Sequence, residues 1–401
     1  MNLHTKAVHS GDRKKPGPAV PVTTPIYTAS TYLYDEMEQL DRVFGREVPG
    51  YSYSRYDNPT NGALEELVTA LENGHGSLAC ASGMAAVQIA LLTALVDRPK
   101  SIVAANALYG ATIAVLGKIF EPLNVDVAYV DICDLAAVKK TIEDRKPGCL
   151  LMETMSNPLL RVGAIDSLAE IAHAAGAAFV VDNTFATPLL VRPLELGANL
   201  VVHSLTKFLA GHGDVLGGTV TSDREHYDNL RTLSRAYGPV LGPFESYLAM
   251  RGIKTFPLRM ERQCANACRI ATALAAHPAV ERVHFPADPA HPDAATIARL
   301  FPPDPARLQI EERFGVQLAH RRSVGAADVV RRNLKLGLSV DHRVLREQQV
   351  AVLLDSVGLL RIGPDDDFAV EYAGSFSIQN SGVELAAGAV RLGVIHHRAV
   401  V

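Results

Sequence analysis

The sequence predicts an α/β fold built on a largely parallel sheet. Short apolar runs recur through the middle of the chain, at residues 101–105, 125–130, 149–153, 178–182 and 199–204. Segments such as LAAVKKTIED and SLAEIAHAAG lie between them and carry apolar residues at helical spacing. Buried strands that alternate with helices are typical of parallel sheets covered on both faces. Ligands of such folds bind at the carboxyl ends of the strands.

Composition narrows the class of protein. The chain has 401 residues, of which 48% are hydrophobic and 20% charged, so it is globular and long enough for two domains. A net charge of -4 without a long Lys/Arg run argues against nucleic acid and against a polybasic membrane anchor. The N-terminus lacks the apolar run of a signal peptide, and no stretch is apolar enough to span a bilayer. Five cysteines form no regular framework, so we expect a cytoplasmic protein with small-molecule partners.

We expect three parts: an N-terminal arm over residues 1–60, a large domain over 61–255 and a C-terminal domain over 256–401. The arm is rich in Pro, Thr, Tyr and Gly and has little helical periodicity, so it should lie on its own body or on a neighbouring subunit. It contains YSYSRYDNPT, whose guanidinium and phenol groups are suited to holding a phosphate. The same segment also fits a turn before the next helix.

Lys207 stands at the centre of the stretch VVHSLTKFLAGHGDVLGG. The pattern predicts a short loop just past a buried strand, where a shielded amine can form a Schiff base with an aldehyde. An isolated lysine is more often a solvated loop residue, so the functional interpretation of Lys207 depends on the residues around it.

Three further features are consistent with an aldehyde cofactor. Asp182 ends an apolar run in VVDNTFATP, where a carboxylate needs a cation. The residues ASGM, 81–84, precede a helix and offer free amides to an anion. Tyr109 follows a strand and can stack on a heteroaromatic ring. Each pattern alone also fits a turn, a helix start or a core residue, but together with Lys207 they match the needs of pyridoxal phosphate.

A set of motifs in fixed order resembles one known family. The motifs YSRYDNPT, ASGMAA, LYGAT, SNP, VDNTFATP, HSLTKFLAGHGD and RGIKTFPLRM are similar to those of the pyridoxal-phosphate enzymes of cysteine and methionine metabolism, the cystathionine γ-synthase and γ-lyase group. The resemblance covers about residues 21–303. It implies an aspartate-aminotransferase-like fold (fold type I), with a mostly parallel sheet in the large domain and a smaller C-terminal α/β domain. It also implies an amino-acid substrate and a homotetramer of tight dimers with shared active sites.

The resemblance also implies roles for individual residues. Lys207 would carry the cofactor, Asp182 would pair with the pyridinium nitrogen, and Tyr109 would stack on the ring; these three form the expected catalytic set. The remaining expected cofactor-binding residues are Ser82, Gly83, Met84, Asn157, Ser204 and Thr206, together with Tyr53 and Arg55 from a partner subunit. No metal is expected, because His203 and His212 beside the lysine loop have no further ligands at metal-binding spacing.

Beyond Pro303 the resemblance ends. The family carries, near its C-terminus, an arginine that binds the substrate α-carboxylate. Two segments compete for that role, GLLRIG around Arg361 and AVRLGVIHH around Arg391. Arg391 fits better by its distance from the end and by its neighbours, so we expect it to be the substrate-binding arginine.

The expected reaction is removal of the substrate α-proton by Lys207, followed by expulsion of a β or γ substituent on sulfur or oxygen. A cystathionine γ-lyase or γ-synthase reaction is favoured. O-acylhomoserine sulfhydrylase and methionine γ-lyase are the alternatives, and Ala111 argues against the second because methionine γ-lyases typically have cysteine there. A different class also stays open, a homologue that binds the cofactor without catalysis.

Overall fold

The computed structural model describes residues 2–11, 19–45 and 47–301, together with the backbone of three short strands within 358–391. The chain divides into two compact units. The first comprises residues 1–157 and 162–257, and the second comprises residues 158–161 and 258–401.

A seven-stranded sheet forms the centre of the first unit, in the order β1-β7-β6-β5-β4-β2-β3. Its strands are β1 (Gly76–Cys80), β2 (Ser101–Ala105), β3 (Asp126–Val130), β4 (Cys149–Glu153), β5 (Ala178–Asp182), β6 (Leu200–Ser204) and β7 (Gly218–Ser222). Strands β2 to β6 pair in parallel, so the predicted α/β fold with a mostly parallel sheet is confirmed.

The antiparallel edge of the sheet has no counterpart in the sequence prediction. Strand β7 pairs antiparallel with both β1 and β6. It reads GTVTS and is fully buried, yet only one of its residues, Val220, is a large apolar side chain. The Ser77 and Thr221 hydroxyls lie 2.8 Å apart, so these two buried polar groups share a hydrogen bond. A buried strand with so many hydroxyl side chains escapes a search for apolar runs.

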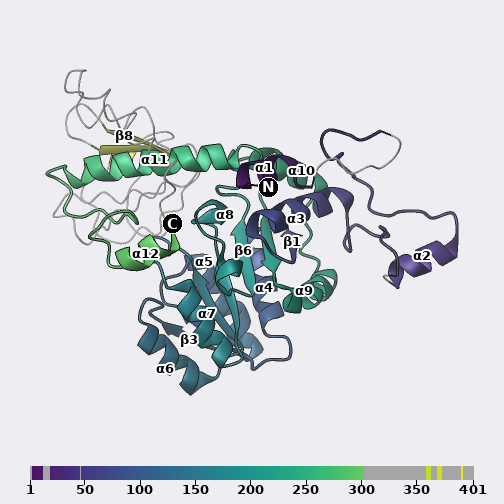
Figure 1. The fold of residues 1–401 in the computed structure, drawn as a ribbon, viewed down its shortest axis with the longest axis horizontal. Helices are drawn as coiled ribbons and strands as arrows, with labels where there is room; N and C mark the ends of the chain where they lie inside the picture. Colours follow the sequence, from purple (N-terminus) through teal and green to yellow (C-terminus); the bar gives the residue numbers. More distant parts are fainter. Residues whose placement is uncertain are drawn as a thin grey trace. The chain divides into compact units, whose positions relative to one another are not determined.

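Helices cover the sheet of the first unit (Figure 1). Helix α3 begins at Pro59, directly after its N-cap Asn58, whose side chain accepts from the amides of Thr60 and Asn61. Ser82 caps α4 in the same way. The helices after the arm are α3 (Pro59–Glu72), α4 (Gly83–Ala94), α5 (Gly110–Val115), α6 (Leu135–Arg145), α7 (Ile165–Ala174), α8 (Thr187–Leu190), α9 (Arg224–Tyr237) and α10 (Pro243–Ile253), with short π and 3-10 turns at Leu116–Phe120, Glu121–Leu123 and Pro193–Leu196.

The N-terminal segment contributes two helices, α1 (Leu3–His9) and α2 (Met37–Phe44). Helix α1 packs beside α3 and buries Ala7. Helix α2 buries none of its residues, and Leu33 and Met37 are 100% and 71% exposed. The described part of this segment therefore leaves large apolar side chains in solvent, which is costly for a chain that acts alone.

The second unit contains α11 (Phe256–Ala275) and α12 (Ala294–Leu300), with a small core formed by Ala267, Ile270, Ala271 and Val283. Arg161 forms a two-bonded ion pair with Asp293, at 2.7 and 3.0 Å. Three antiparallel strands, β8 (Gly358–Ile362), β9 (Phe368–Tyr372) and β10 (Val390–Arg391), form a sheet in the order β10-β9-β8. Among the residues that the structure describes, no helix is long and apolar enough to cross a membrane.

Candidate active site

The carboxyl ends of three neighbouring parallel strands carry the central polar residues. Asp182 ends β5 and lies directly opposite Glu153, the last residue of β4. Ser204 ends β6, the next strand along, and Lys207 follows three residues later. The sheet register therefore brings to one edge residues that lie far apart in the sequence, as expected for ligand sites in parallel sheets.

Asp182 is a carboxyl group held in a largely dry position. The amide of Thr184 donates to its Oδ1 at 2.9 Å. Burial raises the pKa of Asp182, while the hydrogen bonds from Thr184 and the charge of His203 act in the opposite direction. A carboxyl in this state gains stability when a cationic or protonated ring nitrogen lies beside it.

Glu153 is a residue of this edge that the sequence reasoning missed. Its side chain is 8% exposed. Oε1 accepts from the amide of Tyr109 at 2.6 Å, and Oε2 accepts from the amide of Asn157 at 3.0 Å. Burial, followed by the charge of Asp182, raises the pKa of Glu153 to about 8. The sequence contains a signal for this residue. Glu153 is a carboxylate that directly follows an apolar run, in METMSNP, just as Asp182 does in VVDNTFATP.

The start of α4 packs closely against the sheet edge. A Cβ added at Gly83 would lie 2.9 Å from the Cβ of Ser204, and one added at Gly218 would lie 2.4 Å from the carbonyl oxygen of Ser82. The hydroxyl of Ser82 accepts from the amide of Ala85 at 3.1 Å. The first amides of a helix have no partner within it, so those of Gly83 and Met84 are available to an anion beside Ser204. Glycine is required here because any side chain would fill this cradle.

The lysine loop is anchored at both ends. The amide of Lys207 donates to the Ser204 carbonyl at 3.3 Å, and the amide of Gly211 donates to the Lys207 carbonyl at 2.9 Å. Lys207 itself is half-buried, between the buried side chains of Leu205 and Leu209. The hydroxyl of Thr206 accepts from the amide of Gly217 at 3.2 Å. The structure thus places Lys207 on the short loop after a buried strand that the sequence predicts.

Tyr109 precedes α5 and has its backbone held by Glu153, while its side chain is 43% exposed. Asn157 is held by the same carboxylate. The contacts of Glu153 therefore bring Tyr109 and Asn157 to the edge that carries Asp182. An exposed aromatic ring beside the polar edge of a sheet is suited to stacking on a planar ligand.

Tyr53 and Arg55 have contacts of another kind. The Arg55 guanidinium donates to the backbone carbonyl of Arg235 and lies over the rings of Tyr53 and Tyr56, 5.3 and 4.7 Å from their centroids. Tyr53 is 41% exposed. Within the described part of the chain, the contacts of this segment lead to α9 and not to the lysine loop.

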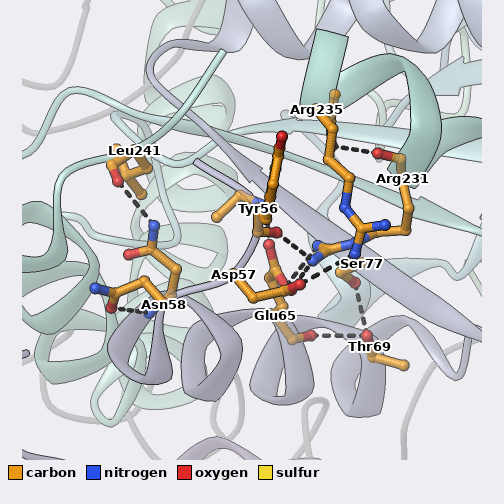
Figure 2. Close-up of polar contacts among 12 residues, drawn as sticks. Tyr56, Asp57, Asn58, Glu65, Thr69, Ser77, Arg231, Arg235 and Leu241 are labelled. Carbon is orange, nitrogen blue, oxygen red and sulfur yellow. Dashed lines mark hydrogen bonds and ion pairs between the residues drawn. The ribbon is translucent and has the colours of Figure 1, made fainter. Parts of the chain in front are cut away.

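An ion-pair cluster fixes the segment that carries Tyr53 and Arg55 (Figure 2). Arg231 donates to Glu65 Oε2 at 3.0 Å, to the carbonyl of Tyr56 at 3.1 Å and to Asp57. Arg235 reaches the other oxygen of Asp57 at 3.1 Å. Glu65 Oε1 accepts from the amide of Ala79 at 2.9 Å, so the cluster joins the segment to α3, α9 and β1.

His203 is a buried residue of β6, and it forms a polar pair instead of packing in the loop. Its Nε2 lies 2.5 Å from Oε1 of Glu72, and both side chains are fully buried. The side-chain amide of Asn183 donates to the same oxygen at 3.0 Å. No group of three potential metal ligands occurs among the described residues.

Arg391 lies in β10, and its side chain is outside the described residues. The backbone register places Arg391 and Arg361 opposite the same residue, Ala369, on the two sides of β9. The two candidate arginines therefore occupy one row of the small sheet, and the register does not favour either.

The geometry defines a class of ligand. An anion cradle beside a lysine, a carboxyl that gains from a protonated ring nitrogen and an exposed aromatic ring together fit an aldehyde cofactor with a phosphate and a pyridine ring. These residues fit pyridoxal phosphate, and the fold is that of a fold type I pyridoxal-phosphate enzyme.

Comparison with known proteins gives the family. The Cys/Met metabolism PLP-dependent enzyme family matches residues 4–303, and the chain belongs to it. An L-methionine γ-lyase of Fusobacterium nucleatum is 41% identical over 293 residues, which is 72% of this chain and 73% of that protein. A cystathionine γ-synthase of Mycobacterium tuberculosis is 36% identical over 392 residues, 97% of this chain and 92% of that protein. A crystal structure of cystathionine γ-lyase from Lactobacillus plantarum in complex with L-serine superposes with a TM-score of 0.69, at 34% identity over 75% of this chain and 76% of that one.

The chain is therefore a pyridoxal-phosphate-dependent enzyme of cysteine and methionine metabolism, with γ-elimination or γ-replacement as its reaction class. The expectation that the resemblance ends near residue 303 holds for the family match. It does not hold for the cystathionine γ-synthase, whose alignment covers 97% of the chain.

Proposed function

We propose that this enzyme carries out a cystathionine γ-synthase type reaction, in which a thiol replaces the γ substituent of an activated homoserine. The observation that carries this choice is the extent of the similarity. The alignment with a cystathionine γ-synthase spans 97% of the chain, whereas that with the methionine γ-lyase of Fusobacterium nucleatum spans 72%. The similarity to the synthase therefore includes most of the C-terminal region, in which the family carries its carboxylate-binding arginine.

We assign Lys207 the central chemical role. Bound pyridoxal phosphate supplies an electron sink for the carbanion that forms when the substrate α-proton leaves. Lys207 would hold the cofactor through its amine, and the same amine is placed to take the substrate α-proton and to return it later. The short loop between Ser204 and Gly211 keeps that amine close to the strand ends.

The surrounding residues orient the cofactor. Asp182 keeps the ring nitrogen protonated, which suits a carboxyl whose pKa is raised by burial and lowered again by a cation. The amides of Gly83 and Met84 and the hydroxyls of Ser82, Ser204 and Thr206 hold the phosphate. Tyr109 would stack on the cofactor ring, and Asn157 would contact the ring hydroxyl.

The minimal active unit in this proposal is a dimer within a homotetramer, located in the cytoplasm. The arm of each subunit, residues 1–60, delivers Tyr53 and Arg55 to the active site of the neighbouring subunit. That site lies in the large domain, residues 61–255. The exposure of Leu33 and Met37 supports a second surface for the arm. Arg391, in the C-terminal domain 256–401, binds the substrate α-carboxylate.

Purified enzyme offered O-acylhomoserine with cysteine, cystathionine alone and methionine alone tests the proposal. The expected result is cystathionine formation from the first mixture at a higher kcat/KM than either elimination. Faster release of methanethiol from methionine would instead assign the enzyme as a methionine γ-lyase. Sulfide in place of cysteine tests the sulfhydrylase alternative, and cofactor binding without turnover of any of these substrates would identify a non-catalytic homologue.

Methionine γ-lyase is the second candidate, favoured by the higher identity of 41% over the matched residues. Ala111 separates the two, since it stands directly after Tyr109-Gly110 where methionine γ-lyases typically have cysteine. Ala111→Cys should raise methionine elimination relative to cystathionine synthesis if this position sets the preference.

A further inference from the structure

Glu153 connects two loops of the active-site edge through a single carboxylate. One oxygen accepts from the amide of Tyr109, at the start of α5, and the other accepts from the amide of Asn157, after β4. The distances are 2.6 and 3.0 Å, so each oxygen is within hydrogen-bonding reach of its amide. Both partners are backbone groups, so replacing the side chains of Tyr109 or Asn157 leaves these bonds available.

Burying the Glu153 carboxyl group beside another carboxyl group costs folding free energy. Glu153 is 8% exposed, and it lies opposite Asp182 across the β4–β5 pair. Two carboxyl groups this close repel one another when both are charged, and burial adds to the penalty. An apolar residue at the end of β4 would extend the buried pattern of the strand, which is continuous from Cys149 to Met152. Structural stability alone therefore does not favour glutamate here.

The alternative to a functional role is a plain loop anchor. A loop anchor needs one acceptor for one amide, and a serine or an asparagine would suffice. Glu153 instead uses both oxygens on two segments, and these two segments carry the expected stacking residue and the residue expected near the cofactor hydroxyl. The arrangement fixes Tyr109 and Asn157 relative to one another and to the strand end beside Asp182.

We propose that Glu153 is a positioning residue that sets the tilt of the Tyr109 ring and the place of Asn157 against the cofactor ring. This inference rests on the proposed function in taking Tyr109 and Asn157 as cofactor contacts. Glu153 acts through those two residues and does not touch the reacting atoms. A change at Glu153 should thus alter how the cofactor is held before it alters the proton transfer by Lys207.

Glu153→Gln keeps the shape and replaces one of the two acceptor oxygens with a donor NH2 group. Loss of one of the two hydrogen bonds should weaken pyridoxal-phosphate binding roughly tenfold. The circular dichroism of the bound cofactor in the visible range should fall, because that signal reports the fixed tilt of the ring. Glu170→Gln on α7 is the matched control, since Glu170 is exposed, and it should change neither quantity.

A double-mutant cycle separates positioning from a general loss of structure. In a Tyr109→Ala background the ring is gone, so Glu153→Gln should weaken cofactor binding no more than about threefold further. The same tenfold loss in both backgrounds would overturn the proposal, as would an unchanged dichroism signal in Glu153→Gln. If Glu153→Gln does not fold, Glu153→Asp, which keeps the carboxyl group but cannot span both amides, provides the same comparison.

Failure of the proposed function gives a different pattern. Cofactor affinity and dichroism are measured without substrate, so they test Glu153 even if the enzyme favours another sulfur substrate. If Tyr109→Ala leaves both cofactor affinity and dichroism unchanged, Tyr109 is not a cofactor contact, and both the role of Tyr109 and the inference about Glu153 are wrong.

Discussion

Arg231 is the residue whose removal should most affect the stability of the first unit. Its side chain is only 10% exposed and bonds to Glu65, Asp57 and the carbonyl of Tyr56 (Figure 2). Burial raises the pKa of Glu65, and Arg231 is the main group that opposes the rise. Arg231→Met fills a similar volume and leaves Glu65 buried without its cation.

The size of the effect follows from the protonation of Glu65. A glutamate has an ordinary pKa of about 4.3, and each pKa unit corresponds to about 1.36 kcal/mol, so holding it protonated at pH 7 costs about 3.7 kcal/mol. The penalty for leaving Glu65 charged cannot exceed this value, because the group would then take up a proton instead. Breaking a buried ion pair typically costs about 3 to 5 kcal/mol in total. At pH 5.5 the same protonation costs about 1.6 kcal/mol. We therefore expect the loss of stability in Arg231→Met to be about 2 kcal/mol smaller at pH 5.5 than at pH 7.

The sign follows from proton uptake. In the variant, the pKa of Glu65 in the folded state lies further above its unfolded value. The folded state then holds a proton that the unfolded state has lost, and stability falls as pH rises through that window. The chain has no tryptophan, so urea unfolding should be followed by far-ultraviolet circular dichroism. Equal slopes against urea are needed before the midpoints are compared.

Two controls make the measurement specific. Arg251→Met on the exposed face of α10 should change the free energy of unfolding by no more than about 0.5 kcal/mol. Arg231→Met combined with Glu65→Gln should be less destabilised than the sum of the two changes, by about 1 to 3 kcal/mol. If the penalty is the same at both pH values and the two changes are additive, Glu65 is not the group that Arg231 compensates.

Three further predictions concern the site itself. Borohydride treatment of the holoenzyme should fix the cofactor to the peptide that contains Lys207, and a label on any other lysine would contradict the assignment. Gly83→Ala should weaken cofactor binding at least tenfold with little change in far-ultraviolet circular dichroism, because the new Cβ would lie 2.9 Å from that of Ser204. Without cofactor, stability should decrease from pH 5 to pH 8, since the pKa of Glu153 is raised to about 8 and the folded state holds a proton that the unfolded state has already lost in this window. Glu153→Gln should flatten that slope, and an unchanged slope would assign it to other groups.

Much of the first unit could be predicted from the sequence, because its parallel strands are apolar and short. The runs at 101–105, 149–153 and 178–182 coincide with β2, β4 and β5. Lys207 and Asp182 were found since each follows or ends such a run. Local pattern is sufficient in these places because buried parallel strands are apolar on both faces.

Other features depend on contacts between distant residues. The sequence does not indicate that Glu153 would bond to the amide of Tyr109, 44 positions earlier, or that Arg231 would reach Asp57 and Glu65. It also does not indicate that His203 would meet Glu72 in the core. Polar residues at such positions look like ordinary surface residues until folding supplies their partners.

The sequence by itself therefore determined the fold class, the family and the place of Lys207 on a short loop after a buried strand, because these follow from apolar periodicity and from motifs that are local in the chain. Only the tertiary structure decided which buried polar groups act together, namely Glu153 with the amides of Tyr109 and Asn157, Arg231 with Glu65, and His203 with Glu72. The physical reason is that a buried charge is stable only when specific partners satisfy it, and those partners are chosen by the register and packing of the strands.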